Sequence, residues 1–370
     1  MNKRNIRLCL VLSEGMSLQL WDEYGLLNRE LALYRELINY GVHTTFVSFG
    51  KSSEYKYKNI LKEFEIIYNK WGLSNAQYIR FINIFNFYKL SKIDLVKTNQ
   101  LESINTAVKI SRFWKIPLLG RMGYFKSFIA KKIGKSEFSK DIIPLEKKLA
   151  SNSSQIILTT DQSINKFIKY YPISKNKIIL IPNYVDSKIF NYDSSIKKKY
   201  DILFIGRFSV EKNLKNLLKA LIGLNLQILF IGRGELKTMV DEYKTKYNLN
   251  LEIIDMVPNE HLPKYINSSK IYILPSLAEG HPKSLLEAMS CQTPVIGTNV
   301  FGIANLLTHN SNGILCDITI ESIRNSIKKT INDKAMHDKL AKNARKYILE
   351  HFTVQKIAKK EYKVYKNILN

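Results

Sequence analysis

Glu279 and Glu287 are two carboxylates in a stretch whose pattern predicts a strand, a loop, a helix and another strand. The apolar, β-branched run 271–274 predicts a buried strand, and a polar loop that contains Glu279 follows it. Helical residues begin at Lys283 and place Glu287 in the first turns of the helix. The loop therefore connects the carboxyl end of a strand to the amino end of a helix, where α/β sheets bind anions and nucleotides.

The two carboxylates are suited to bind hydroxyl groups, because an ionised carboxylate accepts several hydrogen bonds and donates none. One acid on a loop and one on the adjoining helix can each bind a pair of neighbouring hydroxyls, and such pairs are what sugars offer. A second interpretation of Glu287 alone is a favourable charge at a helix start, which contributes about 0.3–1 kcal/mol. The residues by themselves leave both interpretations open.

Arg207 and Lys212 are two basic residues around another predicted helix start, after the apolar strand 201–205. The free amides of a helix start already favour an anion. Arginine adds a planar fork and lysine a point charge, and charge-assisted hydrogen bonds contribute about 1.5–3 kcal/mol each. The pair indicates a phosphate site, and the alternative is two solvated surface charges.

Three segments of the second half carry a resemblance to a known family. They are Gly206-Arg207-Phe208-x-x-Glu211-Lys212, Glu279-Gly280-x-Pro282, and Leu286-Glu287-Ala288-Met289 followed by Pro294-Val295-Ile296. Together they resemble the signature of retaining GT-B glycosyltransferases, family 4 in particular (glycosyl transferases group 1). The resemblance implies an α/β GT-B fold of two Rossmann-like, doubly wound domains that face a central cleft. It also implies catalytic roles for Glu279 on the donor sugar and for Arg207 and Lys212 on its diphosphate, with Glu287 on the ribose.

Further substrate-binding positions are expected from the same resemblance or from their place after predicted strands. Gly15 stands where the family carries a glycine pair under the diphosphate, and a plain tight turn is its alternative. Arg121 follows a strand and is assigned to phosphate or acceptor, with a surface salt bridge as its alternative. The remaining assigned positions are Asn183, Gly232, Val257, Gly280, His281, Pro282, Lys283, Ser284 and Leu285.

The order of elements predicts two domains. Strands over 7–12 and 42–49, joined by a helix over 21–40, give a Rossmann-type opening. We expect an acceptor-binding domain over 1–190 and a donor-binding domain over 200–352. By the resemblance, 353–370 packs back on the first domain. The family's histidine near the reacting sugar finds no counterpart in this sequence.

The composition of the chain indicates which classes of partner and which compartment to expect. The 370 residues carry a net charge of +25, which indicates a polyanionic partner or a lysine-rich proteome. No nucleic-acid motif is present, so we expect an anionic membrane surface and no nucleic acid. Three scattered cysteines favour a reducing cytoplasm, and neither a metal nor a cofactor is expected. No apolar run is long enough to span a bilayer, and the start resembles a first strand more than a signal peptide. We expect a cytoplasmic, peripheral membrane protein.

Two further segments mix apolar and basic residues. The segment 78–90 is aromatic and apolar on more than one face, which favours a buried helix. The segment 126–140 combines Phe128, Ile129, Ile133 and Phe138 with several lysines, and such a basic amphipathic stretch can lie on a bilayer. A solvated loop and helix is the alternative for this second segment.

These observations predict a retaining glycosyltransferase. It would move a hexosyl unit from a nucleotide-diphosphate sugar to a hydroxyl of a glycan or lipid-linked acceptor, in bacterial surface polysaccharide synthesis. A GT-B-fold sugar-nucleotide epimerase is one alternative. A noncatalytic basic protein that binds membranes or polyanions is the other.

Overall fold

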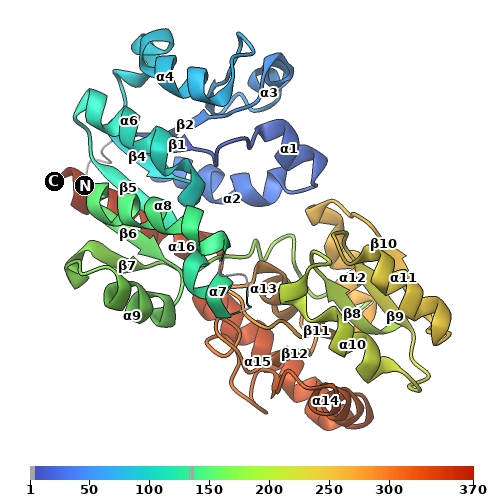
Figure 1. Ribbon diagram of the computed structural model, residues 1–370. Helices are drawn as coiled ribbons and strands as arrows, with labels where there is room; N and C mark the ends of the chain where they lie inside the picture. The colour runs from blue at the N-terminus through green and yellow to red at the C-terminus, as the bar shows by residue number, and fades with distance from the viewer. Residues whose placement is uncertain (1–4, 133, 135–136) are drawn as a thin grey trace. The chain divides into compact units, whose positions relative to one another are not determined.

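The chain forms two compact units, one of Met1–Pro182 with Gln355–Asn370 and one of Asn183–Val354 (Figure 1). The computed structural model describes residues 5–132, 134 and 137–370. Each unit has its own parallel sheet and its own buried apolar core.

The first unit is built on a parallel sheet with the order β3-β2-β1-β4-β5-β6-β7 in the described part of the chain. Its register pairs Leu8 with Thr44 on one side and with Leu95 on the other. The strands are short apolar runs, as expected of strands that helices cover on both faces. They are β1 (Ile6–Val11), β2 (Val42–Val47), β3 (Glu65–Ile67), β4 (Leu95–Thr98), β5 (Leu118–Met122), β6 (Gln155–Leu158) and β7 (Ile178–Leu180).

The helices of the first unit differ from the predicted pattern near its start. One helix was expected over 21–40, but Gly25 adopts a φ of 63° and separates two helices there. A left-handed residue cannot continue a right-handed helix, and glycine takes this conformation without a steric cost. The helices are α1 (Leu18–Glu23), α2 (Leu27–Ile38), α3 (Tyr55–Ile60), α4 (Asn75–Phe85), α5 (Phe87–Leu90), α6 (Ile104–Trp114), α7 (Lys126–Lys132), α8 (Phe138–Asn152), α9 (Asp161–Tyr170) and α16 (Val354–Leu369).

The second unit repeats the arrangement with the parallel order β10-β9-β8-β11-β12-β13. Its strands are β8 (Tyr200–Ile205), β9 (Ile228–Ile231), β10 (Leu251–Ile254), β11 (Ser269–Leu274), β12 (Val295–Thr298) and β13 (Ile314–Cys316). Its helices are α10 (Leu214–Leu221), α11 (Lys237–Lys246), α12 (Leu262–Asn267), α13 (Lys283–Ser290), α14 (Ile320–Asn332) and α15 (Lys334–His351).

In both sheets the direction of strand progression reverses next to the first strand. The reversal lies between β1 and β4 in the first unit and between β8 and β11 in the second. In open α/β sheets, ligands bind outside the carboxyl ends of the strands at this point. The prediction of two Rossmann-like, doubly wound sheets is confirmed for each unit.

The C-terminal helix α16 is fastened to the first sheet by a buried ion pair. Lys97 of β4 and Glu361 of α16 are both almost completely buried and lie 2.5 Å apart. The hydroxyls of Tyr34 and Tyr365 lie 3.5 and 3.3 Å from the same ammonium. The helix α16, which begins directly after Thr353, is therefore part of the core of the first unit.

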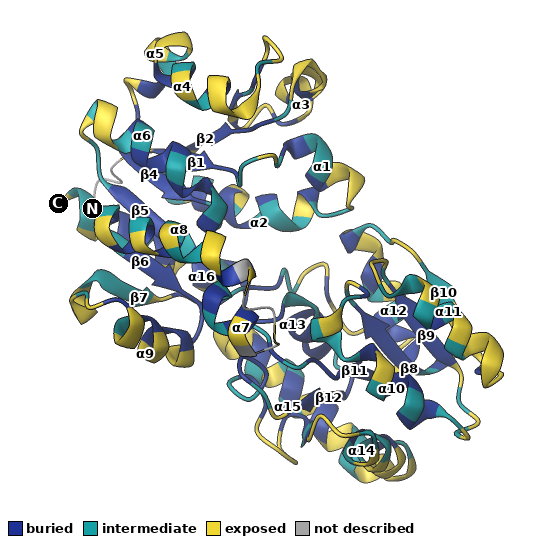
Figure 2. Ribbon diagram, in the orientation of Figure 1, coloured by how far each residue is buried: buried dark blue, intermediate teal, exposed yellow. Residues whose placement is uncertain are grey.

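The structure reverses the interpretation of the two mixed apolar and basic segments. In 78–90, Tyr78 and Ile82 are buried, but Ile84, Phe85, Phe87 and Tyr88 are exposed, so a wholly buried helix is wrong (Figure 2). In 126–140, Ile129 is buried and Phe128 is half-buried against the core, so neither of these two side chains is exposed in full. Ile133 and the side chain of Phe138 lie outside what the structure describes. Among the described helices, none combines the length and the apolar character that a bilayer span requires.

Candidate functional site

The loops after β8 and β11 form the candidate site, at the point where the strand order of the second unit reverses. The loop after β8 runs through Arg207 into a short 3₁₀ turn, Val210–Lys212, which precedes α10. The loop after β11 carries Glu279 and leads into α13. Because the sheet is parallel, both loops leave it at the same edge, which is formed by the carboxyl ends of the strands.

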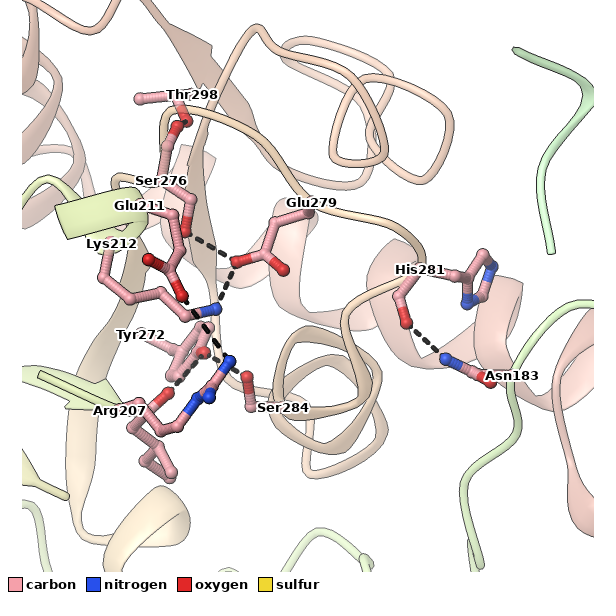
Figure 3. Close-up of polar contacts among 11 residues, drawn as sticks. Asn183, Arg207, Glu211, Lys212, Tyr272, Ser276, Glu279, His281, Ser284 and Thr298 are labelled. Carbon is pink, nitrogen blue, oxygen red and sulfur yellow. Dashed lines mark hydrogen bonds and ion pairs between the residues drawn. The ribbon is translucent and has the colours of Figure 1, made fainter. Parts of the chain in front are cut away.

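Lys212 and Glu279 form an ion pair at the centre of this site (Figure 3). The ammonium of Lys212 donates to Oε1 of Glu279, and the hydroxyl of Ser276 donates to the same oxygen at 2.7 Å. The hydroxyl of Thr298, at the end of β12, donates to the backbone carbonyl of Ser276 and thereby holds the backbone of Ser276 in position. Only 15% of the Lys212 side chain and 13% of the Glu279 side chain are exposed, so water screens this pair less than a surface pair.

The backbone of the Glu279 loop is held closely by the segment after β12. The amide of Glu279 donates to the carbonyl of Phe301 at 2.9 Å. The next residue, Gly302, has a φ of 88°, and a Cβ there would collide with the carbonyl oxygens of Glu279 and Gly280. Glycine at this position is therefore required for the loop to adopt this conformation.

Arg207 is the most exposed charge of the site, with 76% of its side chain open to solvent. One of its terminal nitrogens lies 3.5 Å from Oε1 of Glu211. Burial tends to raise the pKa of Glu211, but hydrogen bonds from its own backbone and from Ser209, with the charges of Arg207 and Lys212, lower it overall. The backbone carbonyl of Glu211 also accepts from the amide of Leu277 at 2.8 Å, which joins the two loops.

Glu287 lies deeper than the sequence suggested. It is the fifth residue of α13 and is 2% exposed, so the interpretation as a charge at the helix start is wrong. Its Oε1 accepts a hydrogen bond from the side-chain amide of Asn259 at 3.0 Å. Asn259 belongs to the turn after β10, so this contact connects α13 to a third loop of the same edge.

Tyr272 and Ser284 form a buried hydrogen bond between β11 and α13. The phenol of Tyr272, on β11, donates to the hydroxyl of Ser284 at 2.7 Å (Figure 3). Burial raises the pKa of Tyr272 far above its usual range, and the negative charges of Glu279 and Glu287 add to this effect. The negative charges of both carboxylates therefore act on the same buried hydroxyl.

The start of α13 presents backbone amides at this edge of the sheet. Pro282 precedes the helix and Lys283 opens it, with its ammonium 5.1 Å from the centre of the Tyr184 ring. The first amides of a helix have no acceptor within the helix, so an anion can bind them. Leu285 was assigned to substrate, but its side chain is completely buried in the core. It therefore has only its backbone amide to offer.

His281 and Asn183 stabilise the loop that leads to α13. The side-chain amide of Asn183 donates to the carbonyl of His281 at 2.6 Å (Figure 3). The imidazole of His281 is 5% exposed and lies 5.2 Å from the ring of Phe352. Asn183 therefore contacts the backbone next to Gly280 and Pro282 in this structure.

Gly232 and Val257 follow β9 and β10 at the same edge. Gly232 has a φ of 148°, and a Cβ there would collide with the carbonyl oxygen of Gly206, so it lets the loop of Arg207 approach closely. Val257 lines a cavity of about 450 Å³ together with Met256, Pro258 and His261. This cavity adjoins the turn that supplies Asn259.

Gly15 and Arg121 belong to the first unit and not to the unit that carries the other candidates. Gly15 has a φ of 81° in the turn after β1, as a tight turn requires. Arg121 lies on β5 and donates from Nη1 to the carbonyl of Asn99 at 3.2 Å. Both residues lie near the reversal of strand order in the first sheet.

The residues that contact the charged groups of the site were not predicted from the sequence. Ser276 donates to Glu279, and Tyr272 donates to Ser284. Glu211 accepts from Arg207, and Asn259 donates to Glu287. The only signal for Glu211 was its place in the segment Gly206-Arg207-Phe208-x-x-Glu211-Lys212, and the only signal for Asn259 was its position two residues after Val257. Within the described residues, no cluster of three or more acidic, histidine or cysteine side chains could hold a metal ion.

Comparisons with known proteins find similar sequences and similar folds. Residues 186–347 match the family described as Glycosyl transferases group 1. An uncharacterized glycosyltransferase of Methanocaldococcus jannaschii is 24% identical over 66% of this chain and 70% of its own length. The UDP-Gal:alpha-D-GlcNAc-diphosphoundecaprenol alpha-1,3-galactosyltransferase of Escherichia coli is 27% identical over 57% of this chain and 60% of its own length. The crystal structure of Anabaena HepE in complex with UDP-glucose superimposes with a TM-score of 0.79 and 15% identity, over 98% of this chain and 100% of that one.

Proposed function

Because residues 186–347 belong to the glycosyl transferases group 1 family and the chain is a glycosyltransferase of the GT-B fold, we propose which transfer it performs. It moves a hexosyl unit from a nucleotide-diphosphate sugar to a hydroxyl of a glycan or lipid-linked acceptor, with retention of the anomeric configuration. We assign this reaction to bacterial surface polysaccharide synthesis. The observation that carries the proposal is the Lys212–Glu279 ion pair, because it joins a cation suited to bind phosphate with a carboxylate suited to bind hydroxyls.

The basic residues act on the leaving group. When the bond between the sugar and the diphosphate breaks, negative charge develops on the diphosphate oxygens. Lys212, the exposed fork of Arg207 and the first amides of α13 stabilise this charge, and they are in place before the reaction. In the same step the acceptor oxygen bonds to the anomeric carbon from the face that the diphosphate leaves. The acceptor proton passes to a diphosphate oxygen, so no protein base is required.

The acids orient the donor. Glu279 accepts hydrogen bonds from hydroxyls of the sugar, and Glu287, oriented by Asn259, accepts from the ribose. Ser284 and the backbone of Gly280 and His281 border the sugar. The backbone around Val257 contacts the base, and the adjoining cavity provides room for it.

The names of similar proteins support the proposed classes of donor and acceptor. The Escherichia coli relative is named for a UDP-galactose donor and a diphosphoundecaprenol-linked acceptor, and Anabaena HepE was crystallised with UDP-glucose. We propose that 200–352 binds the donor and that 1–190 binds the acceptor, with Gly15 and Arg121 contributing from the first unit. A lipid-linked acceptor would place the enzyme on the inner face of the plasma membrane, where its charge of +25 favours anionic lipids.

A donor screen tests the proposal. The purified chain is incubated with a panel of nucleotide-diphosphate hexoses, and release of the nucleoside diphosphate is measured without acceptor and with lipid-linked saccharides. We expect slow hydrolysis of one donor and faster release when the correct acceptor is present, with an α product from an α donor by NMR. Isomerisation of the donor without any transfer would contradict the proposal, and so would an inverted product.

A further inference from the structure

An exposed aromatic surface covers one side of α4 and α5 in the first unit. We call it the aromatic surface, and its members are Trp71, Ile84, Phe85, Phe87, Tyr88 and Phe113. Ile84 is 63% exposed, Phe87 58% and Tyr88 73%. Figure 2 shows the exposed faces of α4 and α5 in yellow. Single exposed apolar residues are common on proteins, but a contiguous group of large ones marks an interaction site.

Several rings of this surface are in contact with a neighbouring ring. The ring centres of Trp71 and Phe85 lie 4.2 Å apart. Phe87 lies 4.8 Å from the half-buried ring of Trp114, which in turn lies 5.0 Å from Phe113. The aromatic surface therefore contains two groups of touching rings, one at the loop before α4 and the end of α4, the other between α5 and the end of α6.

The helix α4 has apolar residues on both of its faces. Tyr78 and Ile82 face the core of the first unit, as expected for a helix that packs on a sheet. The opposite face of such a helix is normally polar, yet here it carries Ile84, and Phe85 is exposed at the last residue of the helix. The core of the first unit does not account for these two side chains, since both are exposed.

Two lysines lie against rings of the aromatic surface, and a third lies against Tyr68, which is not a member of this surface. The ammonium of Lys70 lies 4.3 Å from the centre of the Trp71 ring, and that of Lys92 lies 3.5 Å from the centre of the Tyr88 ring. Lys58 lies 5.1 Å from the ring of Tyr68. Burial lowers the pKa of Lys58, and the positive charges of Lys89 and Lys70 lower it further. The rim is thus a region of positive potential next to an apolar centre.

We infer that the aromatic surface docks on a lipid bilayer that contains anionic lipids. Aromatic rings with a polar edge lie at the level of the lipid headgroups, and neighbouring lysines reach the lipid phosphates. The positive rim and the net charge of +25 complement an anionic leaflet. This inference names the face that the proposed membrane partner contacts. We place the contact here and not at 126–140, because Ile129 is buried and Phe128 is half-buried there, whereas Ile84, Phe87 and Tyr88 are exposed.

Vesicle binding without donor or acceptor tests the inference independently of the transfer reaction. The full chain is sedimented with phosphatidylcholine vesicles that do or do not contain phosphatidylglycerol. We expect binding to the anionic vesicles and a loss of at least about tenfold for the double variant Phe87→Ser/Tyr88→Ser, because two apolar rings no longer leave water. The matched control Tyr192→Ser/Tyr247→Ser changes two exposed rings of the second unit and should bind as the unchanged protein does.

Trp71 provides a reporter at the surface itself. The chain has three tryptophans, and Trp21 is buried while Trp71 is 45% exposed. Lipids with a quencher at the top of the acyl chain should quench the emission of the bound protein, and Trp71→Phe should remove most of this quenching while it preserves binding. Lys70→Gln/Lys92→Gln should weaken binding to anionic vesicles and leave thermal stability unchanged.

Three outcomes would overturn the inference. The aromatic double variant could bind anionic vesicles as well as its control does. It could instead change the sedimentation coefficient of the protein in solution, which would make the surface an interface between copies of the chain. Finally, Trp71 could remain unquenched while the protein is bound, which would place the membrane contact elsewhere. In each case hydrolysis of a nucleotide sugar by the same variants would show whether the donor site is intact.

Discussion

The ammonium of Lys212 and the carboxylate of Glu279 neutralise each other in the second unit, although each is assigned to a different part of the donor. The diphosphate of a donor would attract Lys212, and the sugar hydroxyls would donate to Glu279. A complete nucleotide sugar can satisfy both groups at once, whereas a nucleoside diphosphate satisfies only the lysine. The ion pair therefore makes binding of the two parts of the donor interdependent.

Removal of the cation should abolish most of the transfer. We expect Lys212→Ala to lower kcat/KM by about a hundredfold or more, because one preorganised group that stabilises the leaving diphosphate is lost. Steady-state kinetics with the donor identified in the screen measure this effect. Lys215→Ala, which removes an exposed lysine of α10, is the matched control and should leave the rate unchanged. A nearly normal rate in Lys212→Ala would remove Lys212 from the donor site.

Neutralisation of Glu279 should affect nucleotide and sugar in opposite directions. In Glu279→Gln the ammonium of Lys212 loses its anionic partner, so we expect the free nucleoside diphosphate to bind several-fold more tightly. The same change should lower kcat, because the sugar loses its charged hydrogen-bond acceptor. Calorimetry and kinetics on one preparation measure the two effects, with the exposed Glu242→Gln as control. A parallel loss of both would show that the ion pair does not compete with the diphosphate.

Glu287 should be required for the reaction of the donor and not only for the stability of the fold. Glu287→Ala removes a buried carboxylate that Asn259 holds, and we expect a loss of about a hundredfold in kcat/KM. Glu287→Gln keeps the volume and the hydrogen bond to Asn259 in altered form, so it should lose activity while its melting temperature stays close to that of the unchanged protein. If Glu287→Gln melted normally and transferred normally, Glu287 would have only a structural role.

The strand-loop-helix pattern around Glu279 could be predicted because it depends on local sequence. Apolar runs such as 271–274 are buried by the sheet in any doubly wound fold, and proline and glycine mark the loops. The short strands β10 and β13 were not predicted. Both lie at an edge of the second sheet. The apolar run of β13 is only three residues long, and Glu252 interrupts that of β10, so neither gives a clear strand pattern.

The direction in which an amphipathic segment faces depends on distant residues and could not be predicted. Lys126 carries a charge that suggested a bilayer contact, but its ammonium pairs with Glu102 on a different element. Phe85 belongs to an apolar run that suggested the core, but it packs against Trp71 on the surface. The same limit applies to Asn259, whose contact with Glu287 joins two loops that are remote in sequence. Composition sets the kinds of side chain available, and the fold decides which face they take.

The buried ion pair of the first unit should be strongly asymmetric in mutagenesis. Lys97→Met leaves the carboxylate of Glu361 buried beside Tyr365 without its cation, and we expect a loss of about 3–5 kcal/mol in the free energy of unfolding. Adding Glu361→Gln should recover most of this loss, because no buried charge remains. Urea unfolding of both variants measures the difference, and Lys360→Met on the exposed side of α16 is the control. Equal stability of the single and double variants would contradict this account.

Glu146 of α8 should make the first unit less stable as the pH rises above the ordinary carboxyl range. Its carboxylate is fully buried and accepts from the amide and hydroxyl of Ser127, at 3.1 and 2.6 Å, and from the hydroxyl of Tyr171 at 2.7 Å. Burial raises the pKa of Glu146 above its ordinary value of 4.5, although these hydrogen bonds act to lower it. Between the two pKa values the folded protein binds more protons than the unfolded chain, so stability falls as pH rises through this window.

A neutral side chain at this position should remove that dependence. Because glutamine does not titrate, the melting temperature of Glu146→Gln relative to the unchanged protein should rise from pH 4.5 upward and then level off. Calorimetric scans in a series of buffers from acid to neutral pH measure the difference, and Asp141→Asn changes an exposed carboxylate on the same helix as a control. A constant difference across the series would show that the carboxyl of Glu146 titrates alike in the folded and unfolded chain.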